Sequence, residues 1–322
     1  MARRNILLCF DAFGTLFKPK RPIQEQYASV ARQCGLDGFS AEQVQASFKA
    51  AFSGESKAHP NYGKDSGMGA EKWWTNVIHQ TFRPLIGPDK KLPEDLAPRL
   101  LHRFSSDEGY APAPGVVSLL RSLKQQQQQQ GRNRITVGVI TNSDDRVPSI
   151  LSSLGLRVSP LRYGYGAGTD LDLAGAAGHA YDIDLHCMSY DVGFAKPDRR
   201  IFDAAEHMAN QLLAAQQQRG AEETGSSGSA KVDPPWLKLY VGDDFEKDVV
   251  GAQGAGWNAV FVSPEEHSVS DQKQDIADLE QLEGKNLQDV FPPDGPSPTL
   301  IRAESTQSFL AWLRKRCAEG DQ

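Results

Sequence analysis

The sequence has few cysteines, no excess of basic residues and no long uninterrupted apolar run. Its four cysteines, Cys9, Cys34, Cys187 and Cys317, lack the close spacing of metal ligands, which favours reduced thiols over a disulfide framework. The formal net charge of −6 argues against a dedicated nucleic-acid-binding protein. No apolar run approaches the length of a membrane span, and residues 6–10 are too few for a signal-peptide core. We therefore expect a cytoplasmic protein, with the nucleus as a further location, and neither a membrane nor a nucleic acid as partner.

An aspartate directly follows the first apolar segment of the chain. Residues 5–10 are rich in branched apolar side chains and do not alternate with polar ones, as is typical of a strand buried on both faces of a parallel sheet. Open α/β sheets bind their ligands at the carboxyl ends of such strands. Asp11 is therefore a candidate nucleophile, and the alternative is an aspartate that merely caps the next turn.

Three later segments carry polar residues suited to the same site. They are, in chain order, Thr141 and Asn142 after the apolar residues 135–140, Lys196 before Pro197, and Gly242, Asp243 and Asp248 after the apolar residues 237–241. Small hydroxyl and amide groups at a strand end are suited to gripping an oxyanion. A proline is well tolerated in the first turn of a helix. Four such pieces in this order indicate one shared site.

The order of these segments resembles the four motifs of the haloacid dehalogenase-like hydrolase superfamily. Asp11 and Thr15 match the first motif, Thr141 the second, Lys196 the third, and Gly242, Asp243 and Asp248 the fourth. Residues 59–63 and 196–202 further resemble the branch named haloacid dehalogenase-like hydrolase domain-containing protein 3 and its fungal relatives. The resemblance implies an α/β fold with a Rossmann-like, doubly wound parallel sheet and a helical cap. We expect residues 1–17 and 113–322 to form the core and residues 18–112 the cap.

The chemistry of such a site follows from its charges. Asp11 attacks a phosphoryl or carbon electrophile and forms a covalent ester, which splits one hard displacement into two easier ones. We expect Mg²⁺ at Asp11 and Asp243. Asp248 either joins this metal site or orients Lys196. Lys196 pairs with the nucleophile and the substrate anion, and Thr141 holds the transferring group in line. The expected substrate-binding residues of the core are Phe13, Gly14, Thr15 and Asn142.

Position 13 departs from the phosphatase pattern. Phosphatases of the superfamily have an aspartate there, and general acid-base help of that kind is worth about 10² to 10⁴ in rate. Phe13 cannot supply it, and an aromatic at this position resembles the dehalogenase branch, in which no metal is used. Against dehalogenation, Asp243, Asp244 and Asp248 would raise one another's pKa beside Asp11 unless a cation neutralised them.

Three functions therefore remain open. The first is a weak or specialised Mg²⁺-dependent phosphohydrolase that acts on a small phosphorylated metabolite. The second is a metal-independent, dehalogenase-like hydrolase acting at carbon, and the third is a non-catalytic module that binds an anion or a partner. Fold alone does not decide among them. The expected partner is a small anionic substrate, and the sequence does not identify an oligomeric state.

Residues 18–112 show mostly helical patterns. Apolar side chains recur at helical spacing in residues 22–34, 41–52 and 71–82. A cap of this kind closes over the crevice and supplies specificity. His59 and Asn61, in the loop of residues 59–63, are candidates for lining the pocket mouth, and the alternative is a structural turn.

Three smaller expectations complete the prediction. Trp73 and Trp74 cannot share one helix face, so one is expected in a core and the other at the seam between cap and core. Residues 144–146 are expected to begin a helix, because acidic residues favour its amino end. Residues 305–317 are expected to form a final amphipathic helix.

Overall fold

A computed structural model describes most of the chain. The described residues are 4–87, 90–130, 133–164, 181–224, 234–263, 276–292, 295 and 297–319. They divide into two compact units, the first made of residues 1–17, 112–142 and 155–322 and the second of residues 18–111 and 143–154. The second unit thus takes in residues 143–154, which the sequence assigned to the core. That the two units are separate domains, a core and a cap, stays a prediction.

The first unit is built on a parallel sheet whose seven described strands run in the order β5-β4-β1-β6-β7-β9-β8. The strands are β1 (Arg4–Phe10), β4 (Asn133–Thr141), β5 (Leu185–Met188), β6 (Trp236–Gly242), β7 (Asn258–Val262), β8 (Ala277–Asp278) and β9 (Leu300–Ala303). Residues 5–10 of β1 are buried throughout, which explains why this strand reads as a continuous apolar run. The parallel sheet confirms the predicted α/β fold class.

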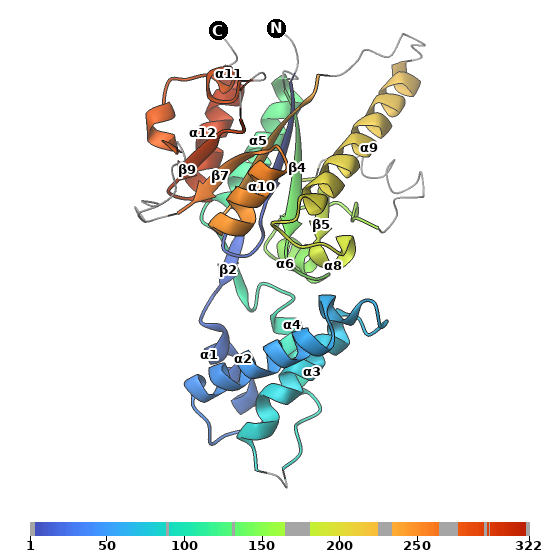
Figure 1. The fold of residues 1–322 in the computed structure, drawn as a ribbon, viewed down its shortest axis with the longest axis vertical. Coiled ribbons are helices and arrows are strands. Elements are labelled where there is room, and N and C mark those ends of the chain that lie inside the picture. Colours follow the sequence, from blue (N-terminus) through green and yellow to red (C-terminus); the bar gives the residue numbers. More distant parts are fainter. Residues whose placement is uncertain are drawn as a thin grey trace. The chain divides into compact units, whose positions relative to one another are not determined.

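Helices cover both faces of this sheet (Figure 1). The helical segments of the first unit are α5 (Val116–Gln130), α8 (Ser189–Val192), α9 (Arg199–Thr224), the π-helical turn η3 (Phe245–Val250), α10 (Gly251–Gly254), η4 (Leu279–Leu282), α11 (Leu287–Val290) and α12 (Thr306–Glu319). On one face α5 packs against α12, and on the other α9 packs against α10. The final amphipathic helix expected at residues 305–317 is confirmed as α12.

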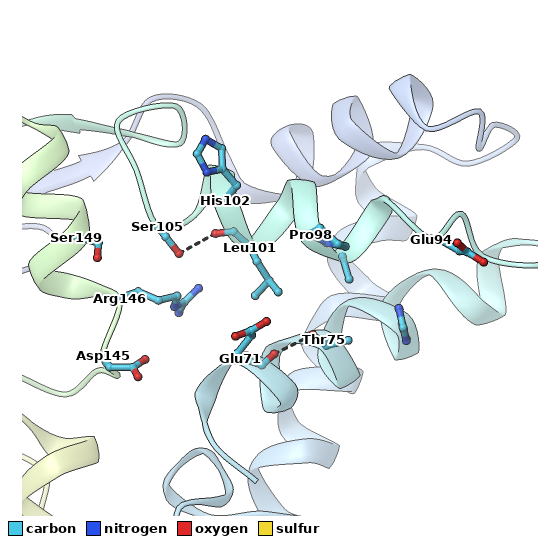
Figure 2. Close-up of a pocket in the computed structure, with 12 residues that line it drawn as sticks. Glu71, Thr75, Glu94, Pro98, Leu101, His102, Ser105, Asp145, Arg146 and Ser149 are labelled. Carbon is cyan, nitrogen blue, oxygen red and sulfur yellow. Dashed lines mark hydrogen bonds between the residues drawn. The ribbon is translucent and has the colours of Figure 1, made fainter.

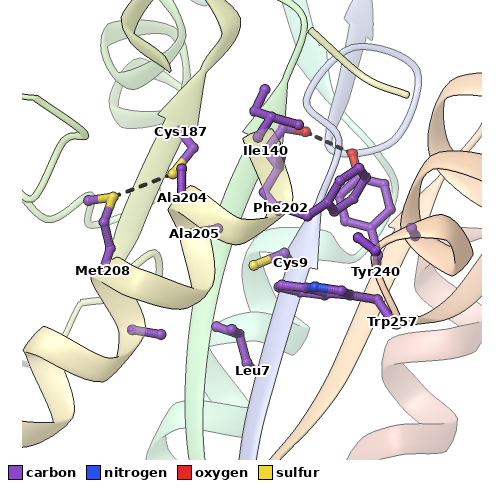
Figure 3. Close-up of a cluster of buried hydrophobic side chains, with 14 of the residues drawn as sticks. Leu7, Cys9, Ile140, Cys187, Phe202, Ala204, Ala205, Met208, Tyr240 and Trp257 are labelled. Carbon is purple, nitrogen blue, oxygen red and sulfur yellow. Dashed lines mark hydrogen bonds between the residues drawn. The ribbon is translucent and has the colours of Figure 1, made fainter. Parts of the chain in front are cut away.

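One hydrophobic core cluster of the first unit lies between the sheet and α9 (Figure 3). Phe202 and Met208 of α9 pack there with Leu7 of β1, Tyr240 of β6 and Trp257. Full burial of a large apolar side chain contributes about 1.5–3 kcal/mol, so this contact fixes α9 firmly on the sheet. The chain segment that precedes α9 is anchored as a result.

The second unit is helical. Its helices are α1 (Ile23–Gln33), α2 (Ala41–Ala58), η1 (Asn61–Gly63), α3 (Ala70–Phe82), η2 (Arg83–Leu85), α4 (Leu96–Arg103) and α6 (Val147–Ser153). The three helices expected near residues 22–34, 41–52 and 71–82 are confirmed as α1, α2 and α3, and α2 continues through Gly54 to Ala58, six residues further than expected. Ser40 and Gln43 form a capping box at the start of α2. Two short strands, β2 (Phe17–Pro19) and β3 (Tyr110–Pro112), pair with each other in a separate two-stranded sheet.

A buried charge cluster joins residues 143–154 to α3. The Asp144 carboxylate accepts hydrogen bonds from the Trp74 indole at 2.7 Å and from the Arg146 guanidinium at 2.7 and 2.8 Å. Burial opposes ionisation of Asp144, but these donors outweigh it and hold the pKa of Asp144 below its usual value. Trp73 is buried in the core of the second unit, as expected for one of the two tryptophans. The cluster explains why residues 143–154 group with the second unit, and α6 begins directly after it.

Candidate active site

The first contact of the predicted site is an ion pair between Asp11 and Lys196. Asp11 directly follows β1, and its backbone N–H donates to the Val241 carbonyl of β6 at 2.9 Å. The Lys196 Nζ lies 2.8 Å from the Asp11 Oδ1. The lysine side chain is buried, whereas the Asp11 side chain is 14% exposed. A partly accessible carboxylate with a buried cation on one oxygen is suited to nucleophilic attack.

Lys196 has two further partners. Its Nζ lies 2.7 Å from the Asp248 Oδ1 and donates to the Tyr240 hydroxyl at 2.7 Å. The other oxygen of Asp248, Oδ2, accepts the backbone N–H of Asp244 at 2.9 Å. Both carboxylate oxygens of Asp248 are therefore already hydrogen-bonded inside the protein, an arrangement suited to holding Lys196 in place.

Asp243 is held by the turn that follows Asp11. The Thr15 hydroxyl donates to the Asp243 Oδ1 at 2.9 Å. Gly14 has a φ of +84°, and a Cβ added there would lie 2.1 Å from the Asp243 Oδ2. Glycine is therefore required at position 14 on both counts, the left-handed backbone and the close approach. The structure gives Gly14 and Thr15 a visible contact with Asp243, and their expected contact with substrate stays a prediction.

Negative charge exceeds positive charge in this cluster. Carboxylate oxygens of Asp11, Asp243 and Asp248 all lie within 4.8 Å of one another, and the Lys196 ammonium contacts two of these residues. Lys247, which also interacts with Asp11 and Asp248 electrostatically, is paired with a further carboxylate, Asp244. Burial raises the pKa of Asp243 and of Asp248, and the nearby Asp11 carboxylate raises both further. Hard carboxylate oxygens in excess of their cation are the donor set that Mg²⁺ prefers. The residues present therefore fit a divalent cation.

Thr141 and Asn142 end β4, the neighbour of β1 in the sheet. Thr141 is buried at the carboxyl edge. The Asn142 side chain donates to the Lys196 carbonyl at 2.9 Å and accepts the Lys196 backbone N–H at 2.7 Å. This two-way contact fixes the backbone of the lysine, whose peptide bond to Pro197 is cis. The roles predicted for Thr141 and Asn142 toward substrate stay predictions.

Phe13 occupies the position that distinguishes the predicted functions. Its side chain is half-buried, and its ring meets the ring of Phe17 edge to face, with centroids 4.7 Å apart. Such a contact fills the position with apolar surface and provides no group that can exchange a proton.

His59 and Asn61 belong to the second unit, whereas the residues of the cluster belong to the first. The His59 carbonyl accepts the Trp73 indole N–H at 3.0 Å, and Asn61 and Tyr62 have φ values of 49° and 56°. These features are those of a tight structural turn. A contact of His59 or Asn61 with substrate stays a prediction.

Sequence reasoning missed Tyr240. This residue was read as part of an apolar strand, yet its hydroxyl donates to the Ile140 carbonyl at 2.7 Å and accepts from Lys196. A signal was present, because a tyrosine in a buried strand generally needs a partner for its hydroxyl.

The second unit contains a cavity of about 680 Å³ (Figure 2). Helices α3 and α4 and residues 145–149 line it, with Arg146 reaching toward Glu71 and Leu101. None of the four motif segments contributes its matched residues, so the cavity is distinct from the Asp11 cluster. Among the described residues, no helix combines the length and the apolar character needed to cross a membrane.

The parallel sheet, with a carboxylate cluster at its carboxyl edge, defines a protein of the α/β class. The chain belongs to the haloacid dehalogenase-like hydrolase family, whose model matches residues 7–256. This match confirms the family predicted from the four motifs.

Relatives of the chain include proteins of fungi and animals. An uncharacterized hydrolase of Schizosaccharomyces pombe is 29% identical over 255 residues, which cover 79% of this chain and 89% of the relative. Haloacid dehalogenase-like hydrolase domain-containing protein 3 of Bos taurus is 25% identical over 293 residues, covering 87% and 96%. Among solved structures, 2-haloacid dehalogenase from Pseudomonas syringae pv. Tomato DC3000 has a TM-score of 0.46 at 17% identity, covering 98% and 99%.

Proposed function

We propose that this protein is a Mg²⁺-dependent phosphohydrolase that acts on a small phosphorylated metabolite through an Asp11 nucleophile. The charge imbalance of the cluster carries the proposal. Three carboxylates surround the Lys196 ammonium, and Lys247, a second ammonium near them in the described part of the chain, is already paired with Asp244. A site that worked at carbon without a metal would gain nothing from Asp243, whose carboxylate raises the repulsion around Asp11.

The residues of the chain take separate parts in this reaction. Lys196 contacts the Asp11 Oδ1, which leaves Oδ2 as the attacking oxygen, and attack on phosphorus yields an aspartyl phosphate and the leaving group. Thr141 holds the phosphoryl oxygens in line, and Asp248 keeps Lys196 on Asp11. Mg²⁺, held by Asp11 and Asp243, supplies the positive charge that lets an anionic substrate approach an anionic nucleophile.

Phe13 narrows the range of substrates that the proposed site can hydrolyse. Because no acid stands at this position, the leaving group must depart as a stable anion, as the carboxylate of an acyl phosphate does. Hydrolysis of the aspartyl phosphate then lacks a general base at the same position. The second step is therefore the slow one, and the covalent intermediate accumulates.

Turnover of two substrates with different leaving groups tests this proposal. We expect acetyl phosphate to be hydrolysed faster than an alkyl phosphate such as glycerol phosphate, with activity lost on addition of a chelator or in Asp11→Asn. Phe13→Asp should raise alkyl phosphate hydrolysis by about 10² or more, because it restores the acid and base. Intact mass spectrometry during turnover should detect the phosphorylated protein.

The aromatic at position 13 also favours a second candidate, a dehalogenase-like hydrolase. Chelator-resistant release of chloride from 2-chloropropionate, with no hydrolysis of acetyl phosphate, would replace the first proposal with this one. Binding of inorganic phosphate without turnover of either substrate would instead support a non-catalytic anion-binding module.

A further inference from the structure

We propose that Tyr240 is a positioning residue that aims Lys196 at Asp11. The inference rests on the proposed function for its kinetic consequences, and on the geometry of the first unit for its structural ones.

The ammonium of Lys196 has as many acceptors around it as it has protons. A lysine carries three N–H donors. Asp11 Oδ1, Asp248 Oδ1 and the Tyr240 hydroxyl oxygen lie 2.8, 2.7 and 2.7 Å from its Nζ. A substrate oxygen could bond to Lys196 only by displacing one of these partners.

Tyr240 accepts from Lys196 because its own proton is used elsewhere. The hydroxyl has one hydrogen and two nearby acceptors, the Ile140 carbonyl at 2.7 Å and the Asp248 Oδ1 at 3.3 Å. The shorter contact takes the proton, and Figure 3 shows this bond crossing from β6 to β4. The lone pair left on the Tyr240 oxygen is directed at the ammonium.

The ring of Tyr240 cannot follow a moving lysine. It is fully buried, and Phe202 meets it edge to face with centroids 5.1 Å apart, beside Trp257 (Figure 3). The backbone of Lys196 is fixed in turn by Asn142. If the Lys196 ammonium moved away, the buried Tyr240 hydroxyl would lose its hydrogen-bond donor, and the full cost of desolvating that hydroxyl would be left uncompensated. Tyr240 and Asn142 therefore hold the ammonium of Lys196 on the Asp11 carboxylate.

Tyr240→Phe tests the inference, since it removes the hydroxyl and keeps the ring. With acetyl phosphate as substrate we expect kcat to fall about 10- to 100-fold and KM to stay within about twofold, because the misplaced charge acts on Asp11 and not on binding. Tyr27→Phe, which removes another buried tyrosine hydroxyl outside the cluster, is the matched control and should keep wild-type kinetics. An unchanged kcat, or a raised KM at unchanged kcat, would overturn the inference.

A crystal structure of the full-length Tyr240→Phe protein tests the same inference without any substrate. We expect the Lys196 Nζ to move off the Asp11 Oδ1. An ammonium that keeps both carboxylate contacts unchanged would show that Tyr240 does not position it. This result stands whether or not acetyl phosphate is hydrolysed, so failure of the proposed function and failure of the inference are told apart.

Discussion

Gly14→Ala should separate the cost of backbone strain from the cost of displacing a carboxylate. At a φ of +84° an alanine costs about 1–2 kcal/mol, which lowers Tm by roughly 2–8 °C for a unit of this size. The added Cβ would also lie 2.1 Å from the Asp243 Oδ2, whereas ordinary contacts begin near 3.4 Å. Asp243 must therefore shift by about 1 Å or more, and a misplacement of that size can cost about 10² in rate.

Gly256→Ala is the matched control for this variant. Gly256 has a φ of +79°, and no described atom lies within 4 Å of the position that its Cβ would take. We expect Gly256→Ala to lose only the thermal stability that backbone strain costs, and Gly14→Ala to lose at least as much. Hydrolysis of acetyl phosphate and Mg²⁺ affinity, measured by calorimetry, should fall in Gly14→Ala alone.

The comparison can refute the reasoning directly. If Gly14→Ala bound Mg²⁺ and turned over substrate as Gly256→Ala does, then Asp243 would not need its place against Gly14. The role of Asp243 in holding the cation would fall with that result.

Three further predictions concern other buried polar groups. Lys124→Met should lower the free energy of unfolding by about 3–5 kcal/mol in urea titrations, because it leaves the buried Asp184 carboxylate, 2.6 Å from the lysine Nζ, without its cation. Burial lowers the pKa of His186 to about 4, so between that value and about 6.5 the unfolded chain binds a proton that the folded chain does not. Stability should therefore fall by up to about 3 kcal/mol as pH drops through this window, and His186→Gln should lack that dependence in urea titrations at pH 7 and pH 5. Asn142→Ala should lower kcat about tenfold, because it removes both hydrogen bonds that hold the Lys196 backbone, and kinetics equal to wild type would contradict this.

The ends of the buried strands could be predicted from sequence because a strand covered on both faces must be apolar along its length. Asp11, Thr141 and Asp243 each follow such a run or end it, and the family match agrees with the motifs that they form. Their order along the chain was enough to suggest one site. The order of the strands in the sheet could not be predicted, since nothing in the sequence of β1 indicates which strands flank it.

Contacts that depend on strand order escaped prediction for the same reason. Tyr240 and Ile140 are separated by 100 residues, and their bond exists because β6 and β4 lie on either side of β1. Trp74 and Asp144 are 70 residues apart, so the membership of residues 143–154 in the second unit was equally hidden. In each case a buried polar group indicates that a hydrogen-bonding partner exists, but the sequence does not identify that partner.

The glutamine tract and the Asp11 cluster lie at opposite ends of the strands of the sheet. The glutamines of residues 125–130 end α5, and the chain then enters β4 at Asn133, the amino end of that strand. Thr141 stands at the other end, eight residues along and about 26–27 Å away at the usual rise of a strand. Gain or loss of glutamines should thus change the edge of the sheet opposite to the Asp11 cluster. A change in the length of the tract should therefore leave the contacts of Asp11 unchanged.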